Sequence, residues 1–297
     1  AMLLDVAEKS ELERVSAMGF ALGYLGGGLL FAVNVLMVLY PESFGLEDKT
    51  QAVRLAFLMV AVWWAVFTLP VVLFVHEPPR SQAPNVIVGM RQTLREFRET
   101  WRLLRQLRMA FIFLLAYWCY IDGVDTIVRM AVDYGLSIGF AAESLLTALL
   151  ITQLVGFPAA LAFGHIGDRM GAKRAIWLAL VVYVIIVFWA WRMNATWEFY
   201  GIAVVIGLVQ GGIQAMSRAL YARMIPRQHA GRLFGLYNMM GKFAAVVGPL
   251  LVGWVTVLTD SSRTGILSVL LLFLTGAWLL SQVNVAEGER EAGSLGG

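Results

Sequence analysis

The sequence GHIGDRMGAKR at Gly164–Arg174 decides the fold of this chain. It lies between two apolar runs, Ala141–Phe163 and Ala175–Trp191, each close to the length of about 20 residues that crosses a bilayer. Its glycines and charges are too polar for a membrane interior, so we predict a short hairpin loop at a membrane surface. Three cations in this loop indicate the cytoplasmic surface, because cytoplasmic loops carry an excess of Lys and Arg.

The composition is that of a membrane protein. Of 297 residues, 59% are hydrophobic and 14% are charged, and the mean hydropathy is +0.73. A soluble domain has about a quarter charged residues. The net charge of +3 arises from loops between apolar runs, which favours no nucleic-acid-binding face. Cys119 is a single cysteine, and His76, His165 and His229 lie far apart, so we expect no enzyme, metal site or cofactor.

Eight apolar runs are long enough to span a bilayer. With the amino end inside, the inside loops and tails hold 16 of the 23 Lys and Arg, and the outside loops hold four, which predicts the orientation. The polar first ten residues give no signal peptide, and Ser10 with Glu13 forms a capping-box pattern at the start of the first helix. The predicted spans are Val15–Leu39, Ala52–Val75, Met109–Tyr134, Ala141–Phe163, Ala175–Trp191, Trp197–Ala222, Leu233–Leu258 and Gly265–Val283.

The segment His76–Arg108 is the longest connection between spans. Its start, HEPPRSQAP, disfavours a helix, whereas the arginines from Arg91 to Arg105 recur at helical spacing opposite Phe97 and Trp101. This pattern predicts an amphipathic helix on the anionic cytoplasmic leaflet. A solvated charged helix and a site for a regulatory partner remain as alternatives.

Glycine and polar residues are concentrated in the first, third, fourth, sixth and seventh spans. Small residues let helices approach closely and polar ones avoid lipid. We therefore expect these five spans to line an interior, and the plain second, fifth and eighth spans to face lipid. Gly248-Pro249 in the seventh span predicts a packing kink.

The loop at Gly164–Arg174 resembles the signature loop of major facilitator superfamily transporters, and four further strings narrow the resemblance. They are GYLGGGLL at Gly23–Leu30, YIDG at Tyr120–Gly123, GLVQGGIQAMSRALYARMIP at Gly207–Pro226 and FGLYNMMGKFAAVVGP at Phe234–Pro249. In these strings the chain is similar to the bacterial "unknown major facilitator" family, relatives of the fungal vacuolar amino-acid effluxers of autophagy. Asp125 and Arg129 are more polar than expected of that family.

The resemblance implies an all-α polytopic bundle, the last eight helices of a 6+6 fold whose first four helices are absent. We expect residues 1–75 to be the last two helices of the amino-terminal half and 76–108 a cytoplasmic linker with the amphipathic helix. Residues 109–285 would form the six-helix carboxy-terminal half, and 286–297 a cytoplasmic tail.

The function implied is secondary transport of a small polar solute by alternating access in a bilayer. Family analogy suggests export of amino acids or related metabolites across a bacterial cytoplasmic membrane, with a proton as the candidate coupling ion. The alternative is a membrane scaffold or sensor that no longer transports. A channel is less favoured because no pore loop or ring of acidic residues is visible.

Polar side chains within the apolar runs are the candidate solute or coupling site, because they are costly in lipid. Asp122, Asp125 and Arg129 share one helical face. Asp125 can pair with Arg129, which leaves Asp122 and Lys242 needing each other, a proton, a solute or water. A static salt bridge between helices is the structural alternative, as are interhelical hydrogen bonds for the glutamines. The full set is Asp122, Asp125, Arg129, Gln153, Gln210, Gln214, Asn238 and Lys242.

The signature loop is the candidate conformational switch. An acid near a helix start gains from the helix dipole, so we predict that Asp168 pairs with Arg14 in one access state and releases it in the other. The residues assigned to this switch are Gly164, Asp168, Arg169, Gly171, Lys173, Arg174 and Arg14.

Overall fold

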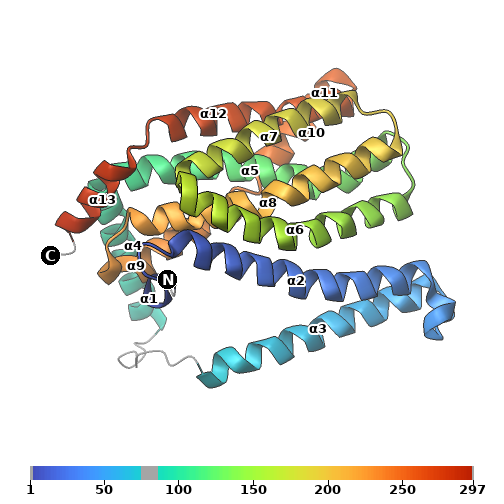
Figure 1. Cartoon of the computed structure of the whole chain (residues 1–297), viewed down its shortest axis with the longest axis horizontal. Helices are drawn as coiled ribbons and strands as arrows, with labels where there is room; N and C mark the ends of the chain where they lie inside the picture. Colours follow the sequence, from blue (N-terminus) through green and yellow to red (C-terminus); the bar gives the residue numbers. More distant parts are fainter. Residues whose placement is uncertain (1–2, 75–85, 296–297) are drawn as a thin grey trace. The chain divides into compact units, whose positions relative to one another are not determined.

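The computed structural model describes residues 3–74 and 86–295 and is all-α, with no strand in that part of the chain (Figure 1). Eight segments of it are long and apolar enough to cross a membrane, which confirms the predicted number. The helices are α1 (Leu3–Val6), α2 (Leu12–Leu39), η1 (Pro41–Phe44), α3 (Lys49–Phe74), α4 (Val86–Gln106), α5 (Arg108–Ser137), α6 (Ala142–Met170), α7 (Ala172–Arg192), α8 (Thr196–Arg223), η2 (Arg227–His229), α9 (Ala230–Phe243), α10 (Val247–Thr259), α11 (Ser262–Leu267), α12 (Val269–Ser281) and α13 (Val285–Ser294).

The chain divides into two compact units. The small unit is Gly27–Trp101, and the large unit is Ala1–Gly26 together with Arg102–Gly297. In the small unit, α3 is almost entirely apolar after Arg54 and buries only Ala52, as expected of a span that faces lipid. The predicted amphipathic helix is α4, in which Phe97 is 45% exposed, and the linker before it lies outside the described residues.

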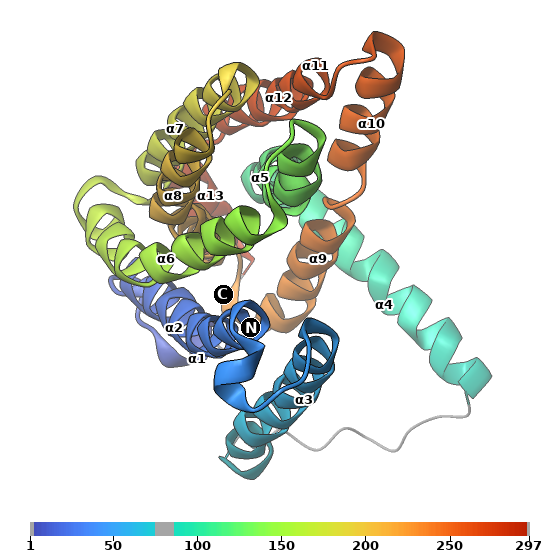
Figure 2. The same cartoon turned by 90° about the vertical axis from the view of Figure 1, so that its right-hand side faces the viewer.

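The core of the large unit is formed by α5 and α8, which are its most buried spans. α6 and α7 pack against α8, and α12 packs against α5 (Figures 1 and 2). Stacked aromatic rings join α5, α8 and α9: Tyr237 lies 4.3 Å from Tyr117 and 5.2 Å from Tyr221, centroid to centroid. These rings lie between α5 and α8 and fix the two central helices against α9.

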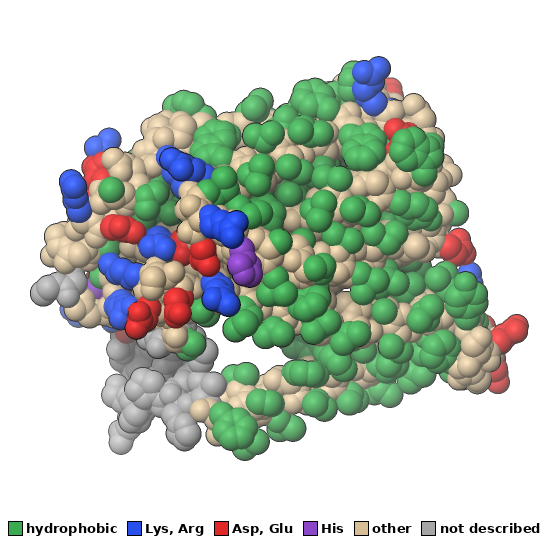
Figure 3. Space-filling view, in the orientation of Figure 1, with side chains coloured by type: hydrophobic (Ala, Val, Ile, Leu, Met, Phe, Trp, Pro, Cys, Tyr) green, Lys and Arg blue, Asp and Glu red, His purple; other side chains and the backbone are tan. Residues whose placement is uncertain are grey.

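The plain fifth span, α7, faces lipid on one side only. Leu178, Val181 and Ile185 are 44–57% exposed, and hydrophobic side chains cover this part of the surface in Figure 3. Its other side carries Ala175 and Ala179, which are fully buried and let α7 approach α8 closely. The expected lipid-facing position of α7 therefore applies to one side of the helix, while its other side packs in the bundle.

The seventh span is broken into α9 and α10 at residues 244–246. Pro249 explains the break, because a proline ring clashes with the carbonyl four residues earlier, here that of Ala245. The predicted kink is confirmed, and it frees backbone groups inside the bundle.

The signature loop is shorter than predicted. α6 stays helical to Met170, α7 begins at Ala172, and only Gly171 lies between them, with a φ of +86°. Glycine adopts this left-handed conformation without steric cost. The polar residues expected in a loop instead extend the last two turns of α6 beyond its apolar part.

The predicted tail is a helix packed on the large unit. In α13, Gly288 and Ala292 are buried, and the Glu291 carboxylate accepts a 3.0 Å hydrogen bond from the Met109 backbone N–H at the start of α5. Charged side chains gather at this end of the large unit, near α13 and the α6–α7 turn (Figure 3). They mark the predicted cytoplasmic surface.

Candidate functional site

An open polar pocket of about 310 Å³ lies in the large unit between α2, α6 and α8. Three polar side chains face it: Gln153 from α6, and Gln214 and Arg218 from α8. The full lining is Gly19, Phe20, Gly23, Tyr24, Gln153, Gln214 and Arg218. We call this the polar pocket.

Helical spacing directs two polar residues of α8 toward the polar pocket. Gln214 and Arg218 are four residues apart and so lie along one face of the helix. Arg218 precedes the end of α8 at Arg223 by five residues, or about 7.5 Å at 1.5 Å per residue. The pocket therefore lies in the half of the span nearer the predicted cytoplasmic surface.

Tyr24 is held between α6 and α8 by two glycines. A Cβ at Gly156 would lie 2.6 Å from the Tyr24 ring, and one at Gly211 would lie 2.7 Å from it. Both glycines are therefore required for the ring to enter between the helices. By contrast, a Cβ at Gly19 or Gly23 would meet nothing within 4 Å, so these glycines form an open wall of the polar pocket.

The polar groups of the pocket have no partners among the described residues. Gln153, Gln214 and Arg218 make no hydrogen bond or ion pair with that part of the chain. All three side chains are half-buried, so their polar groups are available to water or to a ligand in the pocket. An arrangement of three such groups around one pocket is typical of a site for a polar ligand.

Asp122 stabilises the broken helix instead of facing the polar pocket. It is 1% exposed, and its Oδ1 accepts hydrogen bonds from the Gly248 N–H at 3.0 Å and from the Thr126 hydroxyl at 3.4 Å. Gly248 N–H is one of the unpaired donors at the start of α10, so Asp122 caps this helix from α5. No ion pair joins Asp122 to Lys242 in the described part of the chain, and Lys242 is exposed.

A largely buried ion pair joins α2 to α8 at the predicted cytoplasmic end. Arg223 donates from Nε and Nη2 to the two oxygens of Glu13, at 2.7 and 2.6 Å. The Ser16 hydroxyl donates to the Ala215 carbonyl at 2.8 Å, which adds a second link between α2 and α8. Glu13 therefore does not complete the predicted capping box, because its carboxylate has a stronger, charged partner.

The signature segment packs against the start of α2 as predicted, but through glycines. A Cβ at Gly164 would lie 2.9 Å from the Ala17 side chain, and one at Gly167 would lie 3.2 Å from Glu13. Asp168 and Arg14 are both exposed and form no ion pair within the described residues. The ion pair at the start of α2 is instead that of Glu13 with Arg223 of α8.

Lys173 is the cation of the signature segment that has a defined role. Its Nζ donates to the carbonyls of Val283 at 2.7 Å and Ser281 at 3.3 Å, at the end of α12. The carbonyls at a helix end lack backbone partners, and a cation there also complements the helix dipole. Arg169 and Arg174 are exposed.

Sequence comparison identifies the family. The profile of the family described as "Vacuole effluxer Atg22 like" matches residues 4–293. The chain belongs to this effluxer family.

Curated relatives agree with the assignment to the effluxer family. The chain is 35% identical over 285 residues to the "Uncharacterized MFS-type transporter YxiO" of Bacillus subtilis, covering 95% of this chain and 66% of that protein. It is 26% identical over 316 aligned residues to "Autophagy-related protein 22" of Yarrowia lipolytica, covering 94% and 51%. The protein of the same name from Cryptococcus neoformans is 27% identical over 305 residues, covering 94% and 54%. The chain thus spans between about half and two thirds of these relatives.

Other predicted site residues of this effluxer-family chain lie outside the polar pocket. Arg129, Asn238 and Lys242 are exposed, and Asp125 and Gln210 are half-buried. No ion pair joins Asp125 to Arg129 in the described chain, contrary to the sequence expectation. Of these residues only Gln210 belongs to a helix that lines the polar pocket, which is formed by α2, α6 and α8.

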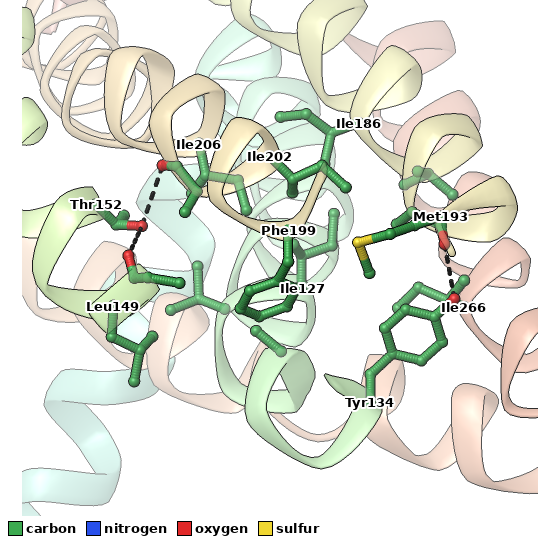
Figure 4. Close-up of a pocket in the computed structure, with 16 residues that line it drawn as sticks. Ile127, Tyr134, Leu149, Thr152, Ile186, Met193, Phe199, Ile202, Ile206 and Ile266 are labelled. Carbon is green, nitrogen blue, oxygen red and sulfur yellow. Dashed lines mark hydrogen bonds between the residues drawn. The ribbon is translucent and has the colours of Figure 1, made fainter. Parts of the chain in front are cut away.

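A second cavity, of about 50 Å³, lies between α5, α6, α7 and α8 and is lined by hydrophobic side chains such as Ile127, Phe199 and Ile202 (Figure 4). Its two hydroxyls already have partners. The Tyr134 hydroxyl donates to the Ala190 carbonyl at 2.7 Å, and the Thr152 hydroxyl lies 3.1 Å from the carbonyls of Ala148 and Ala203. This cavity offers no free polar group to a polar solute.

Sequence reasoning missed three residues of the site: Glu13, Tyr24 and Arg218. Arg218 carried a signal, since few cations lie inside the apolar runs. The glycines at 156 and 211 were visible as small residues, but nothing in the sequence shows which side chain enters between them.

Proposed function

We propose that this chain is part of a secondary transporter that moves a small polar solute by alternating access. The observation that carries the proposal is the polar pocket: three membrane-spanning helices direct the unpartnered side chains of Gln153, Gln214 and Arg218 into one open space. Polar side chains within a bilayer are expensive unless they line a pathway or bind one another.

The second support is the ion pair between α2 and α8. Glu13 and Arg223 lie nearer the predicted cytoplasmic surface than the residues of the polar pocket, and in this proposal they form part of a barrier on that side. An alternating-access carrier must open and close such a barrier on each side of its solute. In this proposal the described arrangement is closed to the cytoplasm.

The proposed solute class rests on family analogy. We take amino acids or related metabolites, moved outward, as the first candidates, because the sequence resembles the fungal vacuolar amino-acid effluxers and the matching family is described as vacuole effluxers. The bilayer is the cytoplasmic membrane of a bacterium and a proton is the coupling ion in this proposal. Residues 1–75 and 109–285 belong to the two halves that move, joined through residues 76–108.

The experiment is efflux from proteoliposomes that contain the protein and are preloaded with labelled solutes. Separate vesicles hold an amino-acid mixture, a sugar mixture and a nucleoside mixture. We expect the amino-acid pool to leave faster than from empty vesicles, and a proton gradient to change the rate. Failure of all three pools to move contradicts transport, whereas movement of sugars alone contradicts only the solute class.

A pocket-filling substitution connects transport to the polar pocket. Gly23→Leu places a side chain in open space in the pocket without a clash in the described chain. Gly253→Leu is the matched control, because Gly253 also lies in a membrane span with nothing within 4 Å of its Cβ position. We expect Gly23→Leu to lose at least nine tenths of the transport rate and Gly253→Leu to keep more than half. Equal rates in the two variants contradict this assignment of the pocket.

A further inference from the structure

Arg218 is a cation inside a membrane-spanning helix without a counter-charge. It lies within α8, faces the polar pocket, and makes no hydrogen bond or ion pair with any described residue. The other cation near this end of α8, Arg223, is paired with Glu13. Since a guanidinium stays protonated under all ordinary conditions, Arg218 carries an unneutralised charge into the bundle.

The geometry points to Arg218 as the residue that binds the carboxylate of the solute. This inference rests on the proposed transport function and names the chemical group that the polar pocket selects. A guanidinium presents paired N–H donors that match the two oxygens of a carboxylate. A carboxylate solute would supply the charge that the pocket lacks.

The charge balance of the pocket favours a carboxylate over a phosphate. Arg218 is the only charged side chain among the residues that line it. One guanidinium neutralises one carboxylate, whereas a phosphate monoester carries between one and two negative charges near pH 7. A second cation is absent from the lining, so a phosphate that carries more than one negative charge would be only partly neutralised there.

The other lining residues are suited to the remainder of a small solute. Gln153 and Gln214 offer amide donors and acceptors, while Phe20 and Tyr24 offer aromatic surface. Gly19 and Gly23 leave the opposite wall without side chains. The pocket can therefore hold a polar head beside Arg218 and a short apolar body against α2.

The test measures binding to the protein in nanodiscs with four probes that differ by one group. Valine carries both an ammonium and a carboxylate, isovalerate only the carboxylate, isobutylamine only the ammonium, and valinamide an amide in place of the carboxylate. We expect valine and isovalerate to bind about 10- to 100-fold more tightly than valinamide and isobutylamine, the range for hydrogen bonds to charged groups. Phenylacetate, lactate and succinate are further carboxylate probes with different side groups. Methylphosphonate is the probe for the phosphate class.

Variants at Arg218 assign the effect to this side chain. Arg218→Gln should reduce the preference for carboxylates to less than threefold, and Arg218→Lys should retain part of it, because lysine keeps the charge but loses the paired donors. Arg227→Gln is the control, since Arg227 is an exposed arginine just beyond the same helix. If Arg218→Gln fails to fold, the probe series on wild-type protein and on Arg218→Lys still decides the inference.

The outcomes distinguish this inference from the transport proposal. Binding of no carboxylate, equal binding of valine and valinamide, or tighter binding of methylphosphonate overturns the role of Arg218 as a carboxylate site. In each of these cases, efflux of another solute that Gly23→Leu blocks would leave the transport proposal standing. A carboxylate preference that survives Arg218→Gln also overturns the assignment.

Discussion

Glu13 and Arg223 form a two-point ion pair that joins the first turn of α2 to the last residue of α8. The Glu13 side chain is 3% exposed and the Arg223 side chain 23%, so the pair is largely shielded from water. Arg223 also lies 3.7 Å from Glu289 of α13. Arg223 thus has a second carboxylate within reach when Glu13 moves away, which suits a contact that breaks and re-forms.

We predict that Glu13→Gln loosens the closed cytoplasmic end. Removing one partner of a buried ion pair costs about 3–5 kcal/mol, and partial exposure of Arg223 with its neighbour Glu289 reduces the expected loss to roughly 1–3 kcal/mol. A cysteine placed at Gln214 in a Cys119→Ala background should then be labelled several-fold faster by a thiol reagent added from the cytoplasmic side. The measurements are unfolding free energy and labelling rate.

Arg95 and Glu99 provide the matched control for the Glu13 variant. They form an ion pair at 3.0 Å whose side chains are 82% and 44% exposed. An exposed pair at this spacing contributes about 0.3–0.5 kcal/mol, so Arg95→Gln should change neither measurement appreciably. If Glu13→Gln changes the unfolding free energy and the labelling rate as little as Arg95→Gln does, the Glu13–Arg223 ion pair is not a barrier.

The cap on α10 predicts opposite results for two substitutions of Asp122. Asp122→Asn keeps an oxygen that can accept from the Gly248 N–H, so the melting temperature should stay near that of wild type. Asp122→Ala removes the acceptor and should cost about 0.5–2 kcal/mol, the range for loss of a helix cap. Thermal unfolding of the two variants in the same detergent measures this difference.

Transport by Asp122→Asn separates capping from coupling. If the proton-coupling role of Asp122 expected from the sequence holds, the Asn variant should fold normally yet lose the dependence of efflux on a proton gradient. We expect instead that coupling is retained, because the carboxylate is already bound to the backbone of α10. Loss of coupling in a stable Asn variant would restore the original assignment.

The packing of Tyr24 predicts a rescue by a second substitution. Gly156→Ala brings a methyl group to within 2.6 Å of the ring, and Gly211→Ala to within 2.7 Å, so each should cost about 1–3 kcal/mol through overpacking. Tyr24→Ala removes the ring, and Gly156→Ala should cost much less in that background. Gly19→Ala meets no atom and serves as the neutral control. A cost of Gly156→Ala that is the same with and without Tyr24 contradicts this packing.

The sequence alone was sufficient to predict the membrane-spanning segments, because a bilayer imposes a constraint on each segment by itself. Each crossing needs about 20 apolar residues, whatever its neighbours are. The kink before Pro249 was also predictable, since its cause lies within five residues of the chain. The exact end of α6 at Met170 was not predictable, because a polar sequence at a membrane surface can continue as helix or turn into a loop.

The site was harder to predict because its residues come from distant parts of the sequence. Glu13 lies 210 positions from Arg223, and the local capping-box pattern gave it a plausible nearby role. The sequence argument selected Lys242 as a possible partner of Asp122, whereas the packing of α2, α6 and α8 brings Arg218 to the polar pocket. Helical spacing shows which residues share a face of one helix, but not which helix that face meets.

The last prediction concerns two neighbouring cations of the signature segment, Lys173 and Arg174. Lys173 donates to the carbonyls of Ser281 and Val283, whereas Arg174 is exposed. We therefore expect Lys173→Met to destabilise the end of α12 by about 0.5–1.5 kcal/mol for the lost hydrogen bonds. Arg174→Met, which removes the same charge one residue away, should have little effect on stability.

Hydrogen exchange locates the effect of Lys173→Met. Loss of the cap should increase exchange in the last turn of α12 and in α13, which begins at Val285, only two residues beyond the bound carbonyl of Val283. Exchange at the start of α5 should rise as well, because Glu291 of α13 accepts from the Met109 N–H. Since α13 also carries Glu289 beside Arg223, detachment of this helix would weaken the closed end of the bundle. Equal exchange in the Lys173 and Arg174 variants would mean that these cations act only as topology signals and that Lys173 does not hold α13 in place.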